Sequence, residues 1–304
     1  MGLGLQGLPL CGADPEVDSV GLDFHTRIIR HSVVRLQGPV LRAKIRPMKL
    51  LLVCSLKGGT GKTTVAVGLA RALRRTGKKV GILDLDFRTP NVPVVLGGGA
   101  EDAELGLGPD DVIVPATVEG LQVVSMAYIW PPERCVEVSD EDALKDVIQM
   151  LTPGVIAWCP DFVVLDTPPT ATGMVRAALA APDLIGAVIV SHPSRVARVD
   201  TERTIDMFRE HQVPVIILVS NMGTDGTGGQ MFDLTDADLK AVADRHGIPA
   251  FFSLPYVREG PARDALFDQL LRAVLGTEPV LLARREPSDA GWKAAVKLAR
   301  RVLK

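Results

Sequence analysis

The eight residues from Lys57 to Thr64 (K-G-G-T-G-K-T-T) constrain the fold of this chain more than any other part of its sequence. An apolar run at 50–54 precedes them, and a segment with apolar residues at helical spacing follows them from Val65 to Leu73. Strand, glycine loop and helix is the context of a phosphate-binding loop, because the glycines let backbone N–H groups turn toward phosphate and the helix start adds free donors. The sequence therefore predicts a fold built around a phosphate-binding loop.

The side chains of this loop suggest separate roles. Lys62 is expected to reach the β- and γ-phosphates of a nucleotide, and the Thr63 hydroxyl is expected to bind Mg²⁺. One position departs from the usual pattern G-x-x-x-x-G-K-[ST], because Leu56 replaces its first glycine and a second lysine, Lys57, opens the loop. A glycine-rich loop with incidental lysines is the alternative, but the flanking strand and helix favour phosphate binding. The predicted nucleotide-binding residues of the loop are Gly58, Gly59, Thr60, Gly61, Lys62, Thr63 and Thr64.

From residue 49 onward, apolar runs alternate with helical patterns. The near-continuous Val, Ile and Leu runs indicate strands buried on both faces. They predict a doubly wound α/β fold, with a mostly parallel sheet and helices on both faces. The predicted strands are 50–55, 80–85, 121–126, 162–166, 185–191, 214–220 and 249–254, and the predicted helices lie near 61–75, 139–151, 171–181, 195–210, 235–246, 261–275 and 288–303. The glycine-rich stretch 97–111 is predicted to be a mobile surface loop.

The first 48 residues differ from the rest, since loosely alternating basic and apolar residues replace the strand and helix patterns. We expect residues 1–48 to be an N-terminal extension, an arm or a short hairpin, followed by a single P-loop ATPase domain at 49–304. The extension could contact a partner or a second subunit, or be a packed or disordered appendage.

Composition places the chain among ordinary soluble proteins, with 47% hydrophobic and 23% charged residues. Its formal net charge of -2 gives no general bias toward nucleic acid or an anionic membrane. No apolar run reaches the length of a membrane span, and residues 1–10 lack the basic start of a secretory signal. The cysteines (Cys11, Cys54, Cys135 and Cys159) have no C-x-x-C spacing, which suits a reducing compartment. We therefore expect a cytoplasmic protein.

Acidic residues follow two of the predicted strands. In an open α/β sheet ligands bind beyond the carboxyl ends of the strands, so a carboxylate there can hold Mg²⁺ beside a phosphate loop. Asp166 is the predicted metal-side carboxylate, although Asp is also a preferred helix N-cap. Asp86 lies further from its strand and precedes a loop, so we expect it to orient the water that attacks the γ-phosphate. Asp84 is expected to support Mg²⁺ from behind the direct ligands.

A candidate base pocket lies near two later strand ends. Asn221 ends the predicted strand 214–220, and its amide can both donate to and accept from the edge of adenine. Asn before a glycine-containing turn is equally common, so the residue alone leaves both interpretations open. Pro255 ends the last predicted strand and could line the same pocket or simply end the strand.

These residues together resemble the deviant Walker A ATPases of the MinD/ParA/Mrp superfamily, whose motif K-G-G-x-G-K-[ST] matches Lys57 to Thr63. The resemblance implies that two subunits sandwich two ATP molecules with Mg²⁺, and that Lys57 reaches the phosphates bound by the other subunit. It also implies that Asp86 positions water, that Asp166 is the Walker B acid and that Asn221 reads adenine. The expected assembly is a homodimer.

Within that class the chain is most similar to Mrp/ApbC-type proteins, over about residues 50–262. The matching stretches are Val112 to Met126, Asp161 to Gly173 and Gly186 to Gly223. Such proteins carry or assemble iron–sulfur clusters through a C-P-x-C pair shortly after the Asn-Met of this strand, because a cluster needs about four thiolates. Residues 223–230 contain no cysteine here, so we do not expect an iron–sulfur cluster to be bound.

The first functional hypothesis is an ATP-binding protein and weak ATPase with slow turnover. Its ATP-dependent dimerisation would act as a switch in iron–sulfur or metalloenzyme maturation, on a client protein that the sequence does not identify. The alternative is a MinD/ParA-type positioning or partitioning ATPase that binds a membrane or DNA as the ATP dimer. A basic amphipathic segment at 288–304 and the arginines Arg195, Arg198 and Arg203 could serve this role, but both also fit ordinary packed or solvated helix faces. A third possibility is a regulatory subunit with little turnover.

Overall fold

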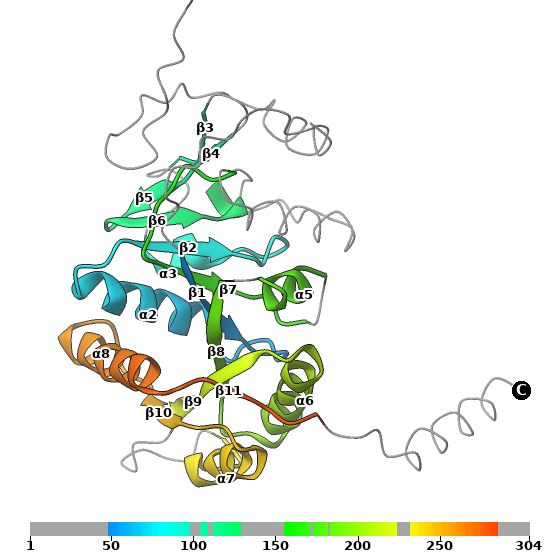
Figure 1. Cartoon of the computed structure of the whole chain (residues 1–304). Coiled ribbons are helices and arrows are strands. Elements are labelled where there is room, and N and C mark those ends of the chain that lie inside the picture. The colour runs from blue at the N-terminus through cyan, green and yellow to red at the C-terminus, as the bar shows by residue number, and fades with distance from the viewer. Residues whose placement is uncertain are drawn as a thin grey trace, which may run out of the picture.

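The computed structural model describes residues 48–97, 104–108, 112–128, 155–170, 173–181, 183–223 and 232–284. A nine-stranded sheet forms the centre of this part of the chain (Figure 1). Its strands are β1 (Lys49–Cys54), β2 (Val80–Asp84), β5 (Ala116–Val118), β6 (Leu121–Val124), β7 (Phe162–Asp166), β8 (Leu184–Ser191), β9 (Pro214–Gly223), β10 (Phe251–Pro255) and β11 (Val280–Leu281).

The strand order is β10-β9-β8-β1-β7-β2-β6-β5, and β11 also pairs with β9. The six pairs from β10 to β6 are parallel, whereas β5 pairs antiparallel with β6 and β11 antiparallel with β9. A separate two-stranded sheet joins β3 (Gly106–Leu107) to β4 (Ile113–Val114). Because the central strands run in the same direction, their carboxyl ends meet at one edge of the sheet.

Helices cover both faces of this sheet. They are α2 (Lys62–Arg75), α3 (Val92–Val95), α5 (Gly173–Leu179), α6 (Arg195–His211), α7 (Asp236–His246) and α8 (Pro261–Gly276), with a short 3₁₀ helix η2 (Met126–Tyr128). Figure 1 shows α2 and α8 on one side of the strands and α5 and α6 on the other. The predicted doubly wound, mostly parallel α/β fold is therefore confirmed.

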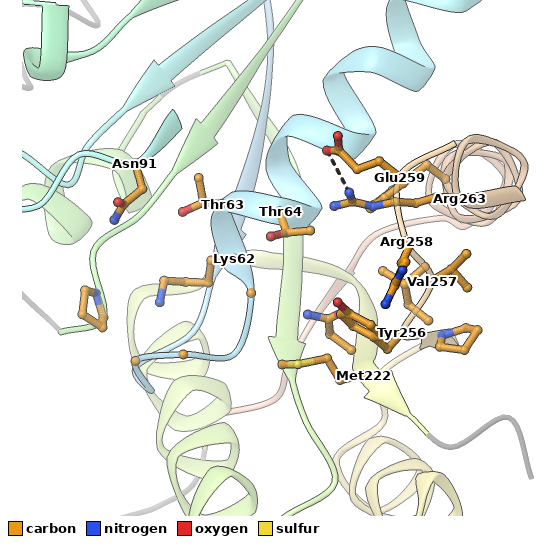
Figure 2. A pocket seen from close by; sticks show the side chains of 18 of the residues that line it. Lys62, Thr63, Thr64, Asn91, Met222, Tyr256, Val257, Arg258, Glu259 and Arg263 are labelled. Atoms are coloured by element: carbon orange, nitrogen blue, oxygen red, sulfur yellow. Dashed lines mark hydrogen bonds and ion pairs between the residues drawn. The ribbon is translucent and has the colours of Figure 1, made fainter. Parts of the chain in front are cut away.

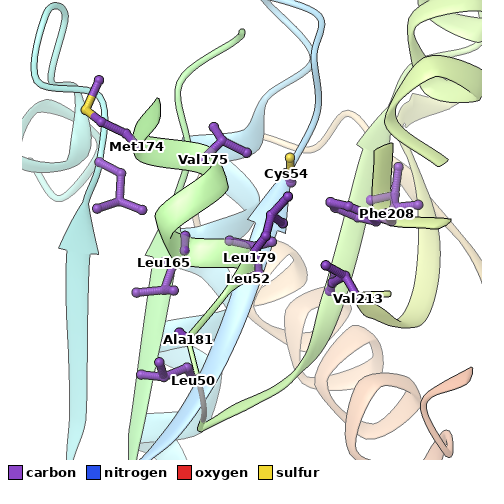
Figure 3. Packing of buried hydrophobic residues seen from close by; sticks show 14 of the residues in the cluster. Leu50, Leu52, Cys54, Leu165, Met174, Val175, Leu179, Ala181, Phe208 and Val213 are labelled. Carbon is purple, nitrogen blue, oxygen red and sulfur yellow. The ribbon is translucent and has the colours of Figure 1, made fainter. Parts of the chain in front are cut away.

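Alternation along β1 explains why it reads as one continuous apolar run. Leu50 and Leu52 join the hydrophobic cluster under α5, α6 and α7, while Leu51 and Val53 join the cluster under α2 and α8. Successive side chains of a strand point to opposite faces, so a strand covered on both faces must be apolar at every position. Figure 3 shows the first cluster, in which Phe208 from α6 packs toward Leu52 and Cys54.

All seven predicted strands and five of the predicted helices are present, with ends shifted by a few residues. The predicted helices at 139–151 and 288–303 lie outside the described residues, as do residues 1–47 of the extension predicted at 1–48. The predicted loop at 97–111 is partly wrong, because Gly106 and Leu107 form β3. β4, β5, β11 and the four-residue helix α3 were not predicted either, because elements this short carry no periodic pattern.

Candidate functional site

The loop between β1 and α2 has the conformation of a phosphate-binding loop. Gly59 and Gly61 adopt positive φ angles of 76° and 84°, which glycine reaches without steric cost. Gly61 precedes α2, whose first turn contains no acidic residue to offset its free N–H groups. The backbone at this helix start therefore presents donors and a partial positive charge.

Lys62 folds back over the loop. Its Nζ donates to the carbonyl oxygen of Lys57 at 3.1 Å, and the residue is only 8% exposed. Burial lowers the pKa of Lys62, and the negative charge of nearby Asp166 partly opposes that effect. The ammonium group thus lies in a partly desolvated place, where it donates to a neutral carbonyl oxygen and a phosphate would be a stronger partner.

Asp166 is a buried carboxyl at the end of β7, one strand away from the loop. Burial raises its pKa to about 7, while a hydrogen bond with Thr63 and the charge of Lys62 act in the opposite direction. Its Oδ1 atom is buried and has no hydrogen-bond partner. Because Asp166 belongs to a strand and α5 begins only at Gly173, it is not a helix N-cap.

These atoms fit a metal ion that arrives with a nucleotide. In the part of the chain that the structure describes, no three His, Cys, Asp or Glu residues form a ready cage for a metal. Mg²⁺ usually keeps several waters and uses few protein oxygens together with substrate phosphates. The Thr63 hydroxyl and the orphaned Oδ1 of Asp166 provide oxygens of that kind beside the loop.

Asp84 lies next to Asp166, since the two residues pair in register at the ends of β2 and β7. Burial raises its pKa well above the ordinary value, and the neighbouring charge of Asp166 acts in the same direction. Its oxygens accept from Ser125 Oγ (2.9 Å), from the Asp86 N–H (3.1 Å) and from the Val92 N–H (3.3 Å). Asp84 therefore holds both ends of the segment that carries Asp86, and a role toward Mg²⁺ stays a prediction.

Asp86 lies at the mouth of the site in the loop after β2. Its carboxylate accepts from the Thr89 N–H at 3.1 Å and from Thr89 Oγ1 at 3.0 Å. Its charge also influences the pKa values of Lys62 and Asp166, which places it close to both. The structure therefore brings together the loop lysine and the two acids that the sequence singled out.

Asn221 contacts the phosphate-binding loop directly. Its Nδ2 donates to the Thr60 carbonyl oxygen at 2.8 Å, and the residue is 7% exposed. A Cβ atom on Gly61 would lie only 2.1 Å from that nitrogen, so no side chain fits there while Asn221 keeps this position. The residue lies within β9, so the interpretation of Asn221 as a turn residue is wrong.

A cavity of about 800 Å³ is lined by Lys62, Asp86 and Asn221, whereas the buried Asp84 and Asp166 are not among its lining residues (Figure 2). Its volume lies within the usual range for small-molecule sites. It runs from Gly58, Lys62 and Asp86 past Asn221 to Pro255. Lys57 is not among its lining residues, and the Lys57 N–H donates to Ser55 Oγ at 3.3 Å.

The far end of the cavity was not anticipated from the sequence. Tyr256, Val257, Arg258 and Glu259 line it directly after Pro255. Glu259 accepts from Arg263 of α8 at 3.0 Å, which ties this segment to the helix (Figure 2). The only signal in the sequence was that these residues follow Pro255, itself a candidate.

The arginines considered for DNA binding all lie on α6. Arg195 forms an ion pair with Asp233 at 3.4 Å, and Arg203 forms one with Asp200 at 2.8 Å. The Nε atom of Arg198 is buried. The described part of this helix is thus a mixed-charge face rather than a free basic stripe. Among the helices of the described segments, none is long and apolar enough to span a bilayer.

Comparison with known proteins places this site in a family. A family model described as "ParA: NUBPL iron-transfer P-loop NTPase" matches residues 46–262. The chain belongs to this family of P-loop NTPases. The matched range begins just before β1 and ends within the first turn of α8, so it includes every residue of the cavity up to Glu259.

Several relatives are named iron–sulfur cluster carrier proteins. The chain is 33% identical to one from Methanocaldococcus jannaschii over 173 residues (57% of this chain and 59% of the relative). It is 38% identical to one from Deinococcus radiodurans over 192 residues (61% and 53%), and 32% identical to one from Pseudomonas fragi over 217 residues (69% and 74%). The chain thus spans about half to three fifths of the first two of these relatives.

Solved structures share the fold. The nucleotide-binding protein of Archaeoglobus fulgidus in complex with ADP is 26% identical, with a TM-score of 0.53, and the match covers 74% of this chain and 87% of that one. The cell division ATPase MinD of Pyrococcus furiosus is 20% identical, with a TM-score of 0.53 and coverage of 75% and 98%. The likeness to MinD concerns the fold alone.

Proposed function

We propose that the chain binds ATP with Mg²⁺ in the cavity beside the Lys57–Thr64 loop and hydrolyses it slowly. The observation that carries this proposal is the meeting of Lys62, Asp86 and the orphaned oxygen of Asp166 around one loop. The family match and the ADP complex of the Archaeoglobus relative support it.

The phosphates are held mainly by the backbone. The N–H groups of Gly58 to Thr64 surround them, and Lys62 exchanges its contact with the Lys57 carbonyl for the β- and γ-phosphates. Thr63 and Asp166 are the residues that would hold Mg²⁺ beside the phosphates. When bound, the metal supplies neutralisation of the charge that develops on the phosphate oxygens. Charge of this kind next to Asp166 also favours its ionised form, which burial otherwise disfavours.

Hydrolysis requires one group to orient water toward the γ-phosphate, and Asp86 is the candidate. Both oxygens of its carboxylate accept from Thr89, so Thr89 competes with a water molecule for them. This competition is in keeping with slow turnover in the isolated chain. Removal of a positioned base typically lowers a rate by about a hundredfold or more.

Asn221 and Pro255 form the base end of the site and favour adenine. The Asn221 side chain already lies against the loop through Thr60. An amide is able to pair with the N6 and N1 edge of adenine by turning only about its terminal torsions.

The proposed ATP-dependent homodimer rests on Lys57. The resemblance to deviant Walker A proteins implies that this lysine reaches the nucleotide of the second subunit, and its absence from the cavity lining of its own chain is compatible with that role. The ATP-bound homodimer would then be one state of a switch and the nucleotide-free monomer the other.

Two variants test this scheme. Asp86→Ala should keep ATP binding but lose hydrolysis, and should accumulate as a dimer in size-exclusion chromatography with ATP and Mg²⁺. Lys57→Ala should bind ATP and remain monomeric, whereas the exposed Lys79→Ala control should behave as wild type. Normal turnover by Asp86→Ala would remove the water-orienting role, and full activity of Lys57→Ala would remove the role across the dimer.

The biological role that fits best is in iron–sulfur cluster maturation, acting on a client protein. The relatives' names support this role. The stretch 223–230 contains no cysteine, Cys54 is buried, and burial raises its pKa to about 11, which makes it a poor cluster ligand. We therefore propose that the chain acts in maturation without a cluster held by a C-P-x-C pair. Anaerobic reconstitution with iron and sulfide should give no stable visible absorption band, and a stable brown holoprotein would contradict this.

A further inference from the structure

One carboxylate ties together the two strands that carry the base end of the site. Asp236, the first residue of α7, accepts from Ser220 Oγ of β9 at 2.5 Å and from Ser253 Oγ of β10. Ser220 and Ser253 are paired in register across these strands. A single side chain from a third element thus fixes the spacing of β9 and β10 near their carboxyl ends.

These hydrogen bonds of Asp236 with the two serines lie directly beside an irregularity in the sheet. Leu254 pairs with Asn221, but the next residue, Pro255, pairs with Gly223, so Met222 is an extra residue in β9. Met222 has a positive φ of 56°, which is uncommon for a residue with a side chain. Such β-bulges occur next to active sites, where they redirect a side chain.

Asp236 fills the space on the inner side of this bulge. A Cβ atom on Gly223 would lie 2.5 Å from Asp236 Oδ2 and 2.6 Å from Oδ1. Gly223 is therefore required by close approach of the carboxylate and not by its own backbone angle. The packing means that the bulge and the carboxylate cannot move independently.

The alternation of side chains along β9 connects the Asp236 contacts to the cavity. Ser220 and Asn221 are neighbours in β9, so their side chains point to opposite faces of the sheet. Ser220 faces Asp236, whereas Asn221 faces the phosphate-binding loop and donates to Thr60. Any change in the twist of β9 at Ser220 therefore redirects Asn221.

Capping of α7 does not account for Asp236. Thr235 is the N-cap residue, and Thr235 and Asp238 form a reciprocal capping box in which the Thr235 N–H donates to Asp238 at 2.8 Å. The helix start is satisfied without Asp236, whose two oxygens turn to the strands instead.

We propose that Asp236 is a positioning residue for nucleotide selection: it locks the β9 bulge so that Asn221 and Pro255 present a fixed adenine-reading edge. The inference rests on the proposed ATP site. Asp236 does not line the cavity itself, so it acts through Asn221 and Pro255. It accounts for discrimination of the base, whereas the phosphates are bound by the loop.

The test is the affinity for ATP and for GTP, measured by calorimetric titration with Mg²⁺ on the full chain. Asp236→Ala should weaken ATP binding about tenfold and change GTP binding much less, because the phosphate contacts persist. Asp236→Asn should restore most of the ATP affinity, since an amide can accept from one serine and donate to the other. Asp238→Ala is the matched control at the same helix start, and it should change neither affinity by more than about twofold.

A double-mutant cycle with Asn221→Ala separates positioning from general destabilisation. In the Asn221→Ala background, Asp236→Ala should have almost no further effect on ATP affinity. An equal loss in both backgrounds, an equal loss for ATP and GTP, or a loss for Asp238→Ala as large as for Asp236→Ala would overturn the inference. Wild-type affinity in Asp236→Ala would overturn it as well, whereas failure of the wild-type chain to bind any nucleotide would refute the proposed function instead.

Discussion

Replacement of Gly68 by alanine tests the packing that supports the far end of the cavity. Gly68 lies in α2 and faces the ring of Phe267 in α8. A Cβ atom there would come within 2.2 to 2.4 Å of three ring atoms, far inside ordinary contact. Residue Phe267 is 3% exposed, and its ring has the Arg263 guanidinium at 5.8 Å on one side and borders the cavity, so the ring can relieve the overlap only by turning into the cavity.

Two opposing effects decide the sign of this substitution. Alanine in place of glycine stabilises an unobstructed helix interior by about 1 kcal/mol. Overpacking of a filled core costs about 1 to 3 kcal/mol. Because the contact falls on a buried aromatic ring and not on a flexible chain end, we expect the cost to exceed the gain. Gly68→Ala should lower the free energy of unfolding by up to about 2 kcal/mol.

Urea denaturation of the nucleotide-free chain measures this difference. Gly276→Ala is the matched control, because Gly276 is the last residue of α8 and nothing lies within 4 Å of its added Cβ. It should leave stability unchanged or raise it by up to about 1 kcal/mol. Gly68→Ala combined with Phe267→Leu should lose less than the sum of the single variants. If Gly68→Ala were as stable as wild type or more so, the reasoning would be refuted.

Three further predictions concern charge and backbone. With a chelator and no nucleotide, burial holds the pKa of Asp166 at about 7, above an ordinary value of about 4, so the folded chain keeps a proton that the unfolded chain loses. The free energy of unfolding should therefore fall as the pH rises from about 5 to 7, and Asp166→Asn should flatten that profile in denaturation curves. Gly61→Ala forces a φ of 84° on a residue with a side chain and displaces Asn221, so titration should show at least about tenfold weaker ATP binding. Arg71 lowers the pKa of Glu119, so Glu119→Gln should cost at most about 1 kcal/mol near neutral pH, and the difference should vanish as the pH falls below the range where Glu119 ionises.

The pair Asp84 and Asp166 shows why such a site conflicts with stability. Two buried carboxyl groups are paired in register on adjacent strands, and burial raises the pKa of both. Three hydrogen-bond donors offset the cost of burying the Asp84 carboxyl group, whereas one oxygen of Asp166 has no donor. Sites that await a ligand commonly keep unfavourable groups of this kind.

The central sheet was predictable because its strands are buried on both faces. β1 and β7 read as nearly unbroken apolar runs, and strands of a parallel sheet between two helix layers require that pattern. The edge strands β5 and β11 are short and half exposed or exposed, so no pattern marks them. Their pairing depends on neighbours far away in the chain.

The candidate site was predictable to the extent that its residues follow strands. Asp86, Asp166 and Asn221 each come at or near a strand end, and Lys62 follows β1 across the glycine loop, so the parallel strands bring them to one edge of the sheet. The role of Asp236 depends on the one-residue bulge between β9 and β10, and register of that kind is not encoded in spacing.

The central claim is that this chain is a Mg²⁺-dependent ATP-binding protein, and calorimetric titration of the purified chain with ATP tests it most directly. The wild-type chain should bind one ATP per chain with Mg²⁺ and bind GTP more weakly. Lys62→Ala should show no saturable binding, while Lys79→Ala should match the wild type. Absence of ATP binding by the wild-type chain, or undiminished binding by Lys62→Ala, would contradict the account.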